Sequence, residues 1–374
     1  MVVDHGVIRW MADVPPDILG YPYSSSDPLS LLNFLTIARR PIPNLLPSNI
    51  EKSLEIASIP LQHAGAGFLI RSAELRDRIE TFVDHVENLM ELLGKYQDRY
   101  TIGMQVLSRC KNAKYSRSCL LEVDAFHKIK LSEDDFAPRP IYNLSNGKTG
   151  RMTITAGSQI LTSPHEVKKC IRSRFDGGKI IEIDFSALEP RTALAIMGSE
   201  LAQIPDIYTH IGSLFSPPLD REKAKQVTIS FLYGATKGTI RHLVDGGPEI
   251  DGELDKLKVM FGFDEIVDNA IAEVKRQGFF RNHAGRPIFP QSSKRGLLFN
   301  NFCQSSAVDV ALSGFSALLD EMSVSCLAEP LYFIHDALIL DVPATELDLV
   351  KEKCAYLPTY LGINFPTKVK ILHN

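Results

Sequence analysis

The sequence has no C-x-x-C pair, although it contains six cysteines. These are scattered along the chain at Cys110, Cys119, Cys170, Cys303, Cys326 and Cys354. Their spacing excludes a zinc ribbon and argues against a disulfide framework in a chain of this length. The sequence also lacks an apolar run of about eighteen residues, and acidic residues stand near its start, where a signal peptide needs an apolar segment. We therefore expect a cytoplasmic protein without a membrane partner.

An excess of charge of either sign is also missing. The 374 residues include 41 basic and 45 acidic side chains, which gives a net charge of −4. This balance excludes a histone-like protein that binds nucleic acid through its overall field. It leaves room for a local basic groove, because a net charge says nothing about where the charges lie. The length is typical of about two to three folding units.

Hydrophobic periodicity divides the chain into helical and strand-like parts. Residues 1–66 are rich in proline and serine, which predicts loops and small helices. Helical patterns cover 72–96, 206–284 and 295–324, and strand-like runs cover 151–155, 179–185, 331–340 and 367–372. The run at 331–340 breaks at His335-Asp336, as a hairpin would. These elements predict an α+β fold in which one sheet is interrupted by a helical insertion.

Two apolar runs each deliver an aspartate to a strand terminus. Asp184 ends the segment KIIEID and precedes a polar turn, while Asp336 stands in the bend of FIHDALIL beside His335. A carboxylate at a strand terminus is rigidly placed yet open to water and phosphate, which suits a Mg²⁺ ligand. Taken one at a time, an aspartate that caps the next helix and a buried His-Asp pair explain these sites at least as well.

A third segment, DREKAKQVTISFLYG at 220–234, predicts a helix with a mixed stripe. Its members are four residues apart and therefore lie along one helical face: Arg221, Lys225, Ile229 and Tyr233. Two cations, an apolar side chain and an aromatic ring suit a nucleotide, with charge for the triphosphate and a flat surface for the base. The more common explanation of such a stripe is a solvated charged end that continues into a buried end.

The order of these segments carries more weight than any one of them. In chain order they are TGR at 149–151, DFSALEPR at 184–191, R-x3-K-x7-Y-G at 221–234, N-x3-Q-x4-D at 300–309 and HD at 335–336. Over residues 140–374 this series resembles the motifs of the family A DNA polymerases. DFSALEPR is similar to motif A of that family, D-Y-S-Q-I-E-L-R. The 221–234 segment is similar to motif B, and IHDA to motif C, V-H-D-E.

The resemblance implies a right-hand polymerase with an antiparallel-sheet palm, a helical fingers insertion and a reduced helical thumb. The implied parts are an N-terminal region with the thumb at 1–140, the palm at 141–190 and 285–374, and the fingers at 191–284. The helix at 72–97 would be the thumb, and a helix simply packed on the core explains it about as well. The roughly 140 residues before TGR are too few for both a thumb and a proofreading exonuclease. We therefore expect a short, phage-type core without that domain.

For function, the resemblance implies template-directed, primer-dependent DNA synthesis from dNTPs with two Mg²⁺ ions. The implied metal ligands are Asp184, Asp336 and the carbonyl of Phe185, and Lys225 is a further catalytic residue. The implied nucleotide-binding residues are Arg221, Lys225, Ile229, Tyr233 and Glu189, with Glu189 set against the sugar. The implied DNA contacts are Arg151, Asn300, Gln304, His335 and Arg286. Primer-template DNA and dNTPs are the expected partners, and processivity would come from replisome partners that the sequence does not identify.

Several positions depart from the family pattern and leave two alternatives open. Ala337 replaces the motif C glutamate, Ile229 replaces an aromatic residue of motif B, and Tyr208 replaces a phosphate-contacting histidine. Ile229 is similar to the residue of single-subunit phage RNA polymerases, which favours ribonucleotide or relaxed sugar use. Glu189 favours deoxynucleotides, because motif A of those RNA polymerases lacks this acid. The second alternative is a catalytically weak, polymerase-derived protein that binds DNA within a replisome.

Overall fold

The computed structural model describes residues 94–125, 129–145 and 147–373, together with 2–4, 7–9, 19–20 and 56. The chain forms two compact units, Met1–Gln105 and Val106–Asn374. Elements described in the first unit are the antiparallel strands β1 (Val2–Asp4), β2 (Val7–Arg9) and β3 (Leu19–Gly20), then η2 (Gly94–Tyr96) and the start of α5 (Gln97–Ser108). The helix predicted over 72–96 lies outside the described residues, apart from its last turn.

The second unit is built on a five-stranded antiparallel sheet. In spatial order its strands are β12 (Glu329–Ile334), β13 (Ala337–Val342), β9 (Lys179–Phe185), β15 (Asn364–His373) and β14 (Tyr356–Pro358). β9 has the sequence KIIEIDF, whose three isoleucines favour an extended strand and are buried. The two-residue turn His335-Asp336 joins β12 to β13, with Ile334 paired to Ala337. The predicted strand at 179–185 and the predicted hairpin are therefore confirmed.

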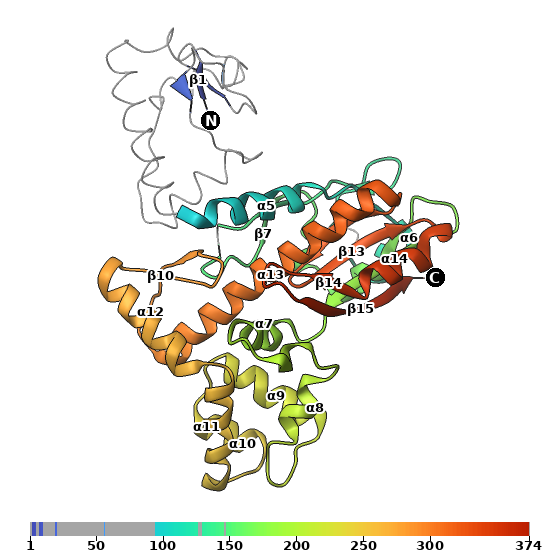
Figure 1. Ribbon diagram of the computed structural model, residues 1–374. Coiled ribbons are helices and arrows are strands. Elements are labelled where there is room, and N and C mark those ends of the chain that lie inside the picture. The colour runs from blue at the N-terminus through green and yellow to red at the C-terminus, as the bar shows by residue number, and fades with distance from the viewer. Residues whose placement is uncertain are drawn as a thin grey trace. The chain divides into compact units, whose positions relative to one another are not determined.

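One face of this sheet packs against α13 (Arg295–Ser325), the long helix that crosses the sheet in Figure 1. The ring of Phe315 lies 5.2 Å from Phe185 of β9 and 5.7 Å from Phe333 of β12. A Cβ at Gly314 would lie 2.8 Å from the Phe185 ring, so the smallest residue stands where the helix meets the strand. Among the described residues, α13 is long and apolar enough to cross a membrane. Since 67% of its most apolar stretch is buried inside the fold, we interpret it as a core helix.

The opposite face of the sheet carries a small mixed layer. Its elements are β4 (Ala113–Tyr115), α6 (Arg117–Glu122), β5 (Phe136–Ala137), η4 (Ile160–Thr162), η5 (His165–Cys170) and β8 (Ile171–Arg172). Ile180 and Ile339 of the sheet belong to the same buried cluster as this layer. A disulfide joins Cys119 of α6 to Cys170 of η5, with 5.3 Å between the Cα atoms. The cysteine spacing argued against disulfides and gave no sign of this bond, since the two residues meet only through tertiary packing.

The strand predicted at 151–155 does not belong to the central sheet. It corresponds to β7 (Thr153–Ala156), which pairs with β6 (Ile141–Asn143) in a separate two-stranded sheet. The expectation of a single sheet is therefore wrong. Periodicity identifies a strand from its own side chains, whereas strand pairing depends on partners elsewhere in the chain.

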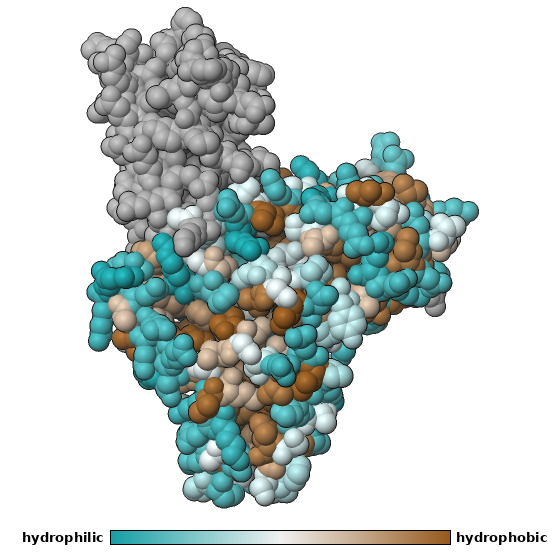
Figure 2. Space-filling model, in the orientation of Figure 1, coloured by the Kyte–Doolittle hydropathy of each residue, from teal (hydrophilic) through white to brown (hydrophobic). Residues whose placement is uncertain are grey.

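A helical block follows β9 and precedes α13. It contains α7 (Leu188–Ile196), η6 (Glu200–Gln203), α8 (Ile207–Gly212), α9 (Arg221–Leu232), α10 (Lys237–Leu243), η7 (Pro248–Ile250), α11 (Asp251–Met260) and α12 (Phe263–Gln277), then the hairpin β10 (Phe280–Arg281) and β11 (Pro287–Ile288). Asp206, Asp220 and Thr236 cap α8, α9 and α10 by accepting hydrogen bonds from backbone N–H groups. Phe231 and Phe261 stack within the core of the block. Figure 2 shows its outer face along α12 as mostly hydrophilic.

The predicted helical region at 206–284 is thus confirmed, and so is the one at 295–324. After β13, η8 (Ala344–Glu346) and α14 (Leu347–Cys354) lead back to the edge strand β14. The second unit is therefore an α+β fold with antiparallel sheets and a helical insertion. The predicted domain boundaries after residues 140, 190 and 284 stay predictions.

Candidate active site

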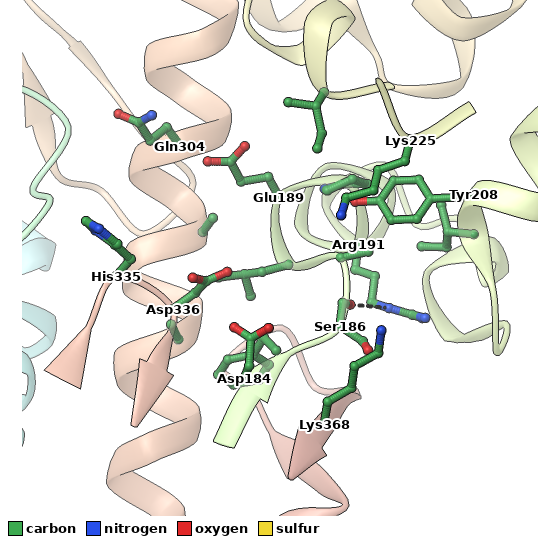
Figure 3. A pocket seen from close by; sticks show the side chains of 18 of the residues that line it. Asp184, Ser186, Glu189, Arg191, Tyr208, Lys225, Gln304, His335, Asp336 and Lys368 are labelled. Carbon is green, nitrogen blue, oxygen red and sulfur yellow. Dashed lines mark hydrogen bonds between the residues drawn. The ribbon is translucent and has the colours of Figure 1, made fainter. Parts of the chain in front are cut away.

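Asp184 and Asp336 lie close together at one corner of the central sheet (Figure 3). Asp184 pairs with Ala337, the residue after Asp336, and the Phe185 N–H donates a hydrogen bond to the Asp336 carbonyl at 3.4 Å. The tight turn holds His335 at a φ of 55°, in the left-handed region that histidine adopts more readily than most residues. The backbone pairing of two strands therefore brings together two aspartates that are far apart in the sequence.

These two carboxylates repel each other in a half-buried site. Burial and the nearby charge of Asp336 raise the pKa of Asp184 to about 6. Burial also raises the pKa of Asp336, against the opposing charges of His335 and Arg151. A pair of like charges held in this way is stabilised by a cation bound between them.

The donor set of this corner fits Mg²⁺. This ion keeps several waters and takes one or two carboxylates together with substrate phosphate oxygens. Ala337 stands where the resemblance has a third carboxylate, and it is buried. Within the part of the chain that the structure describes, no group of three or more His, Cys, Asp or Glu side chains could hold a metal. A cation on Asp184 and Asp336 would therefore complete its coordination with backbone carbonyls, water or substrate oxygens.

The turn after β9 is fixed by a buried arginine. The guanidinium of Arg191, 1% exposed, donates hydrogen bonds to the carbonyls of Ser186 at 2.8 Å, Ala202 at 2.6 Å and Pro205 at 3.1 Å. Ala187 enters α7 at a φ of 54°, a conformation that costs energy for a residue with a Cβ. These contacts hold the turn that follows Asp184 against the helical block.

A second wall of the site is the exposed face of α9. All four members of the predicted stripe line one cleft with the two aspartates, namely Arg221, Lys225, Ile229 and Tyr233. Arg221 forms ion pairs of 2.8 Å with both Asp206 and Glu222, and it lies over the ring of Tyr208 at 5.5 Å. Lys225 has no hydrogen bond or ion pair within the described residues, which leaves its ammonium group available to a ligand.

Arg151 connects three elements around the cleft. It donates to Glu189 of α7 at 3.4 Å and to the Tyr233 hydroxyl at 3.3 Å. With its amide oriented to satisfy both neighbours, Gln304 of α13 accepts from Arg151 at 2.9 Å and donates to Thr149 at 2.6 Å. Burial raises the pKa of Glu189, and Arg151 opposes this shift. Arg151, Glu189 and Gln304 thus form one hydrogen-bonded group in the lining of the cleft.

The cleft has a volume of about 610 Å³, which is large enough for a nucleotide. All of the predicted catalytic, metal-binding and nucleotide-binding residues line it, including Phe185, Glu189 and Lys225. Of the residues predicted to contact DNA, Arg151, Gln304 and His335 line it. Asn300 is absent from the lining and lies one helical turn before Gln304, half-buried.

The prediction for Arg286 needs a correction. Its side chain is 2% exposed and forms an ion pair of 2.8 Å with Asp309, which is also 2% exposed. It also donates a hydrogen bond to the Leu144 carbonyl. A Cβ at Gly150 would lie 2.2 Å from the guanidinium, so the glycine of TGR makes room for this arginine. Arg286 therefore holds the 149–151 loop in place and does not present its charge to a ligand.

Lys368 is a cleft residue that sequence reasoning missed. It stands opposite Asp184 in the pairing of β15 with β9, and it lines the same cleft. The alternation of TKVKIL predicts a strand with its lysines on one face, but it does not tell which strand lies beside it. Only the register of the folded sheet identifies Asp184 as the neighbour of Lys368.

Comparisons with known proteins add little to this geometry. No family model matches the chain, and no curated protein matches it. One solved structure with some similarity is the POL domain of Pol1 from M. smegmatis in complex with DNA primer-template and dNTP, at 15% sequence identity and a TM-score of 0.48. The match covers 91% of this chain and 62% of that chain, so this protein spans less than two thirds of its length. A TM-score at this level does not establish a shared fold.

Proposed function

We propose that this protein catalyses template-directed, primer-dependent DNA synthesis by nucleotidyl transfer from dNTPs. One observation carries the proposal: a single cleft has two adjacent carboxylates on a sheet corner and two cations on the facing helix α9. Phosphoryl transfer needs positioning and charge neutralisation, and these two walls supply both. The order of motifs in the sequence, which resembles that of family A DNA polymerases, supports the same reaction.

In this proposal Asp184, Asp336 and the carbonyl of Phe185 hold two Mg²⁺ ions. When bound, the ions would lower the pKa of the primer 3′-hydroxyl and neutralise charge on the reacting phosphates. The pairing of β9 with β13 holds the backbone of both residues, with Asp184 inside β9 and Asp336 in the turn directly before β13. Placement on paired strands costs less conformational entropy at the moment of reaction than placement on a loop.

The α9 wall would bind the nucleotide. Arg221 and Lys225 would hold the triphosphate, and Lys225 would donate a proton to the leaving pyrophosphate. Tyr233 is 45% exposed at the end of α9 and offers its ring to a base. Glu189 would oppose a ribose 2′-hydroxyl, supported by its hydrogen bond from Arg151.

The DNA would run past the mouth of the cleft. Arg151 and Gln304 would contact primer and template in the minor groove, where acceptor positions vary little between base pairs, and Asn300 is the weaker candidate for this role. His335, exposed in the turn before Asp336, would contact the primer-terminal phosphate. In the right-hand layout that we propose, the palm comprises 141–190 and 285–374, the fingers 191–284, and a reduced thumb lies at 72–97.

A primer-extension assay tests this proposal. A labelled primer on a longer template should grow by one nucleotide only with the matching dNTP, and EDTA should abolish the product. Without dNTPs the primer should keep its length, since we propose no proofreading exonuclease. Absence of extension with either Mg²⁺ or Mn²⁺ would refute the proposal. Tight primer-template binding without extension would instead support the polymerase-derived DNA-binding protein.

A second candidate is a polymerase with relaxed sugar choice, favoured by one observation. Ile229 lines the cleft one turn before Tyr233, where the family pattern has an aromatic residue. A branched aliphatic side chain offers no ring to pack against the Glu189 carboxylate. Insertion of ribonucleotides and deoxynucleotides at similar rates in the same assay would identify this activity.

A further inference from the structure

Lys368 and Asp336 lie on opposite sides of Asp184. The sheet order places β13 on one side of β9 and β15 on the other. In register, Asp184 has Ala337 as its neighbour on β13 and Lys368 as its neighbour on β15. Figure 3 shows the Lys368 side chain extending past Ser186, on the side of Asp184 away from Asp336. Asp184 therefore has the uncharged Ala337 beside it on β13 and the cationic Lys368 beside it on β15.

The ammonium group of Lys368 is available to a ligand. The residue is exposed, and within the described part of the chain it has no hydrogen bond or ion pair. By contrast, Lys168, which approaches the same sheet face from η5, is paired with Glu182 at 2.5 Å. Lys368 is near enough to Asp184 to oppose the rise of its pKa. The charge of Lys368 therefore acts on Asp184, although no hydrogen bond joins its ammonium group to the Asp184 carboxylate.

The position of Lys368 indicates what it would bind. It lines the 610 Å³ cleft together with Arg221 and Lys225, which reach the cleft from the facing helix. Without bound Mg²⁺, a triphosphate carries more negative charge than these two cations neutralise. On the far side of Asp184, the turn with His335 and Asp336 is the proposed place of the primer end. The side nearest Lys368 is therefore left for the phosphates of the nucleotide.

We propose that Lys368 is a third phosphate-binding cation of this cleft, which contacts the nucleotide triphosphate from the sheet side while Arg221 and Lys225 contact it from α9. The identity of the ligand as a nucleotide rests on the proposed function. The phosphate-binding role rests on the register of β15 with β9. Lysine suits it, because an ammonium on a flexible stem binds phosphate as a point charge.

The chain offers a matched control for this role. Lys370 is two residues further along β15, exposed on the same face and paired in register with Glu182. Both lysines line a neighbouring cleft of about 700 Å³ together with Asp184, but Lys370 is absent from the lining of the 610 Å³ cleft. Loss of either lysine changes the net charge equally, so a difference between the two variants reports position.

The experiment measures binding of inorganic tripolyphosphate by isothermal titration calorimetry, with thermal melting to confirm folding. Lys368→Ala should weaken binding about tenfold, whereas Lys370→Ala should stay within about twofold of wild type. Lys368→Arg should restore most of the affinity. Wild-type affinity in Lys368→Ala, equal losses in both alanine variants, or no binding by the wild type would each overturn the proposal.

Primer extension then separates this inference from the proposed function. If the wild type extends primers, Lys368→Ala should raise the KM for dNTP about tenfold and lower kcat much less. An unchanged KM would overturn the inference while the polymerase assignment stands. If the wild type extends no primer but tripolyphosphate binding still depends on Lys368, the polymerase assignment fails and the phosphate site stands.

Discussion

The Val106–Asn374 unit contains two pairs of acidic or basic side chains away from the open surface. One pair joins opposite charges and the other joins two negative charges. Arg286 and Asp309 carry opposite charges 2.8 Å apart, and Asn282 hydrogen-bonds to both residues. Asp184 and Asp336 carry the same charge, and burial raises both of their pKa values. The first pair satisfies its own charges. The second pair would be stabilised by a bound cation, as expected of a site that binds a ligand.

The comparison separates residues that hold the fold from residues that serve a ligand. Breaking a buried ion pair leaves an uncompensated charge, which destabilises the folded state. Removing one of two like charges relieves repulsion, so it should leave the fold intact or stabilise it. Variants of the opposite-charge pair should therefore change the free energy of unfolding, and variants of the like-charge pair should change the rate of extension.

The largest effect should come from the like-charge pair. Asp184→Asn and Asp336→Asn should each lower single-nucleotide extension by about a thousandfold or more, because the described residues offer no third acidic side chain placed to hold the metal with them. Thermal melting and primer-template binding should stay close to wild type. Rapid-quench extension and fluorescence anisotropy measure the two quantities.

Glu182→Gln is the matched control, since it removes a carboxylate two residues earlier on the same face of β9. Its partner is Lys168, and it is absent from the lining of the cleft, so extension should change by about threefold at most. Extension by either aspartate variant at more than about a hundredth of the wild-type rate would count against the two carboxylates as metal ligands.

The next effect concerns the opposite-charge pair. Arg286→Met should lower the free energy of unfolding by about 3–5 kcal/mol, because it removes the cation that compensates the buried Asp309 carboxylate. Adding Asp309→Leu should recover part of the loss. Urea unfolding measures both. Arg295→Met is the control, since its ion pairs with Asp264 and Asp268 are exposed and should contribute less than about 1 kcal/mol. A stable Arg286→Met protein with weakened DNA binding would restore the original prediction of a DNA contact.

Glu189 shares a feature with each pair. Burial raises its pKa, as for the two aspartates, and it accepts a hydrogen bond from a cation, Arg151, as Asp309 does from Arg286. If it opposes a 2′-hydroxyl, Glu189→Ala should reduce discrimination against ribonucleotides by about ten- to thirtyfold. Ile229→Phe should increase discrimination, because a ring restricts the carboxylate. Single-nucleotide insertion of the ribo- and deoxy-forms of one base gives the ratio. An unchanged ratio in Glu189→Ala would show that this acid does not select the sugar.

The smallest expected effect is a pH-dependent increase in the free energy of unfolding of Asp184→Asn relative to wild type. The pKa of Asp184 is raised to about 6 in the folded protein, so its ionisation destabilises the fold as the pH rises from about 4 to above 6. Without divalent cations, Asp184→Asn should therefore be more stable than wild type by about 1–2 kcal/mol near pH 7.5, a figure reduced for partial exposure. The difference should vanish near pH 4. A variant less stable than wild type near pH 7.5 would contradict the like-charge account.

The sequence predicted the parts of the site that depend on local pattern. The strand at 179–185, the hairpin turn at His335-Asp336 and the stripe of α9 all follow from periodicity, and the structure brings them to one cleft. The motif order indicated that Asp184 and Asp336 would meet. Periodicity could not show that Lys368 lies beside Asp184, because the register between β15 and β9 is a property of the folded sheet.

The burial of individual side chains could not be predicted from the sequence either. The family resemblance places Arg286 among DNA contacts, yet the packing of Gly150 and Asp309 around its guanidinium removes it from the surface. The same limit applies to Cys119 and Cys170, which meet only through the contact of α6 with η5. Residue type and spacing describe what a side chain can do, and tertiary packing decides whether a ligand can reach it.

The central claim is that Asp184 and Asp336 form a divalent-cation site, and metal-directed cleavage tests it most directly. Fe²⁺ bound in place of Mg²⁺ generates hydroxyl radicals with ascorbate and peroxide, which cut the backbone near the ion. We predict cuts close to residues 184 and 336, suppressed by excess Mg²⁺ and absent in the Asp184→Asn/Asp336→Asn double variant. Cuts elsewhere in the chain, or the same cuts in the double variant, would contradict the claim.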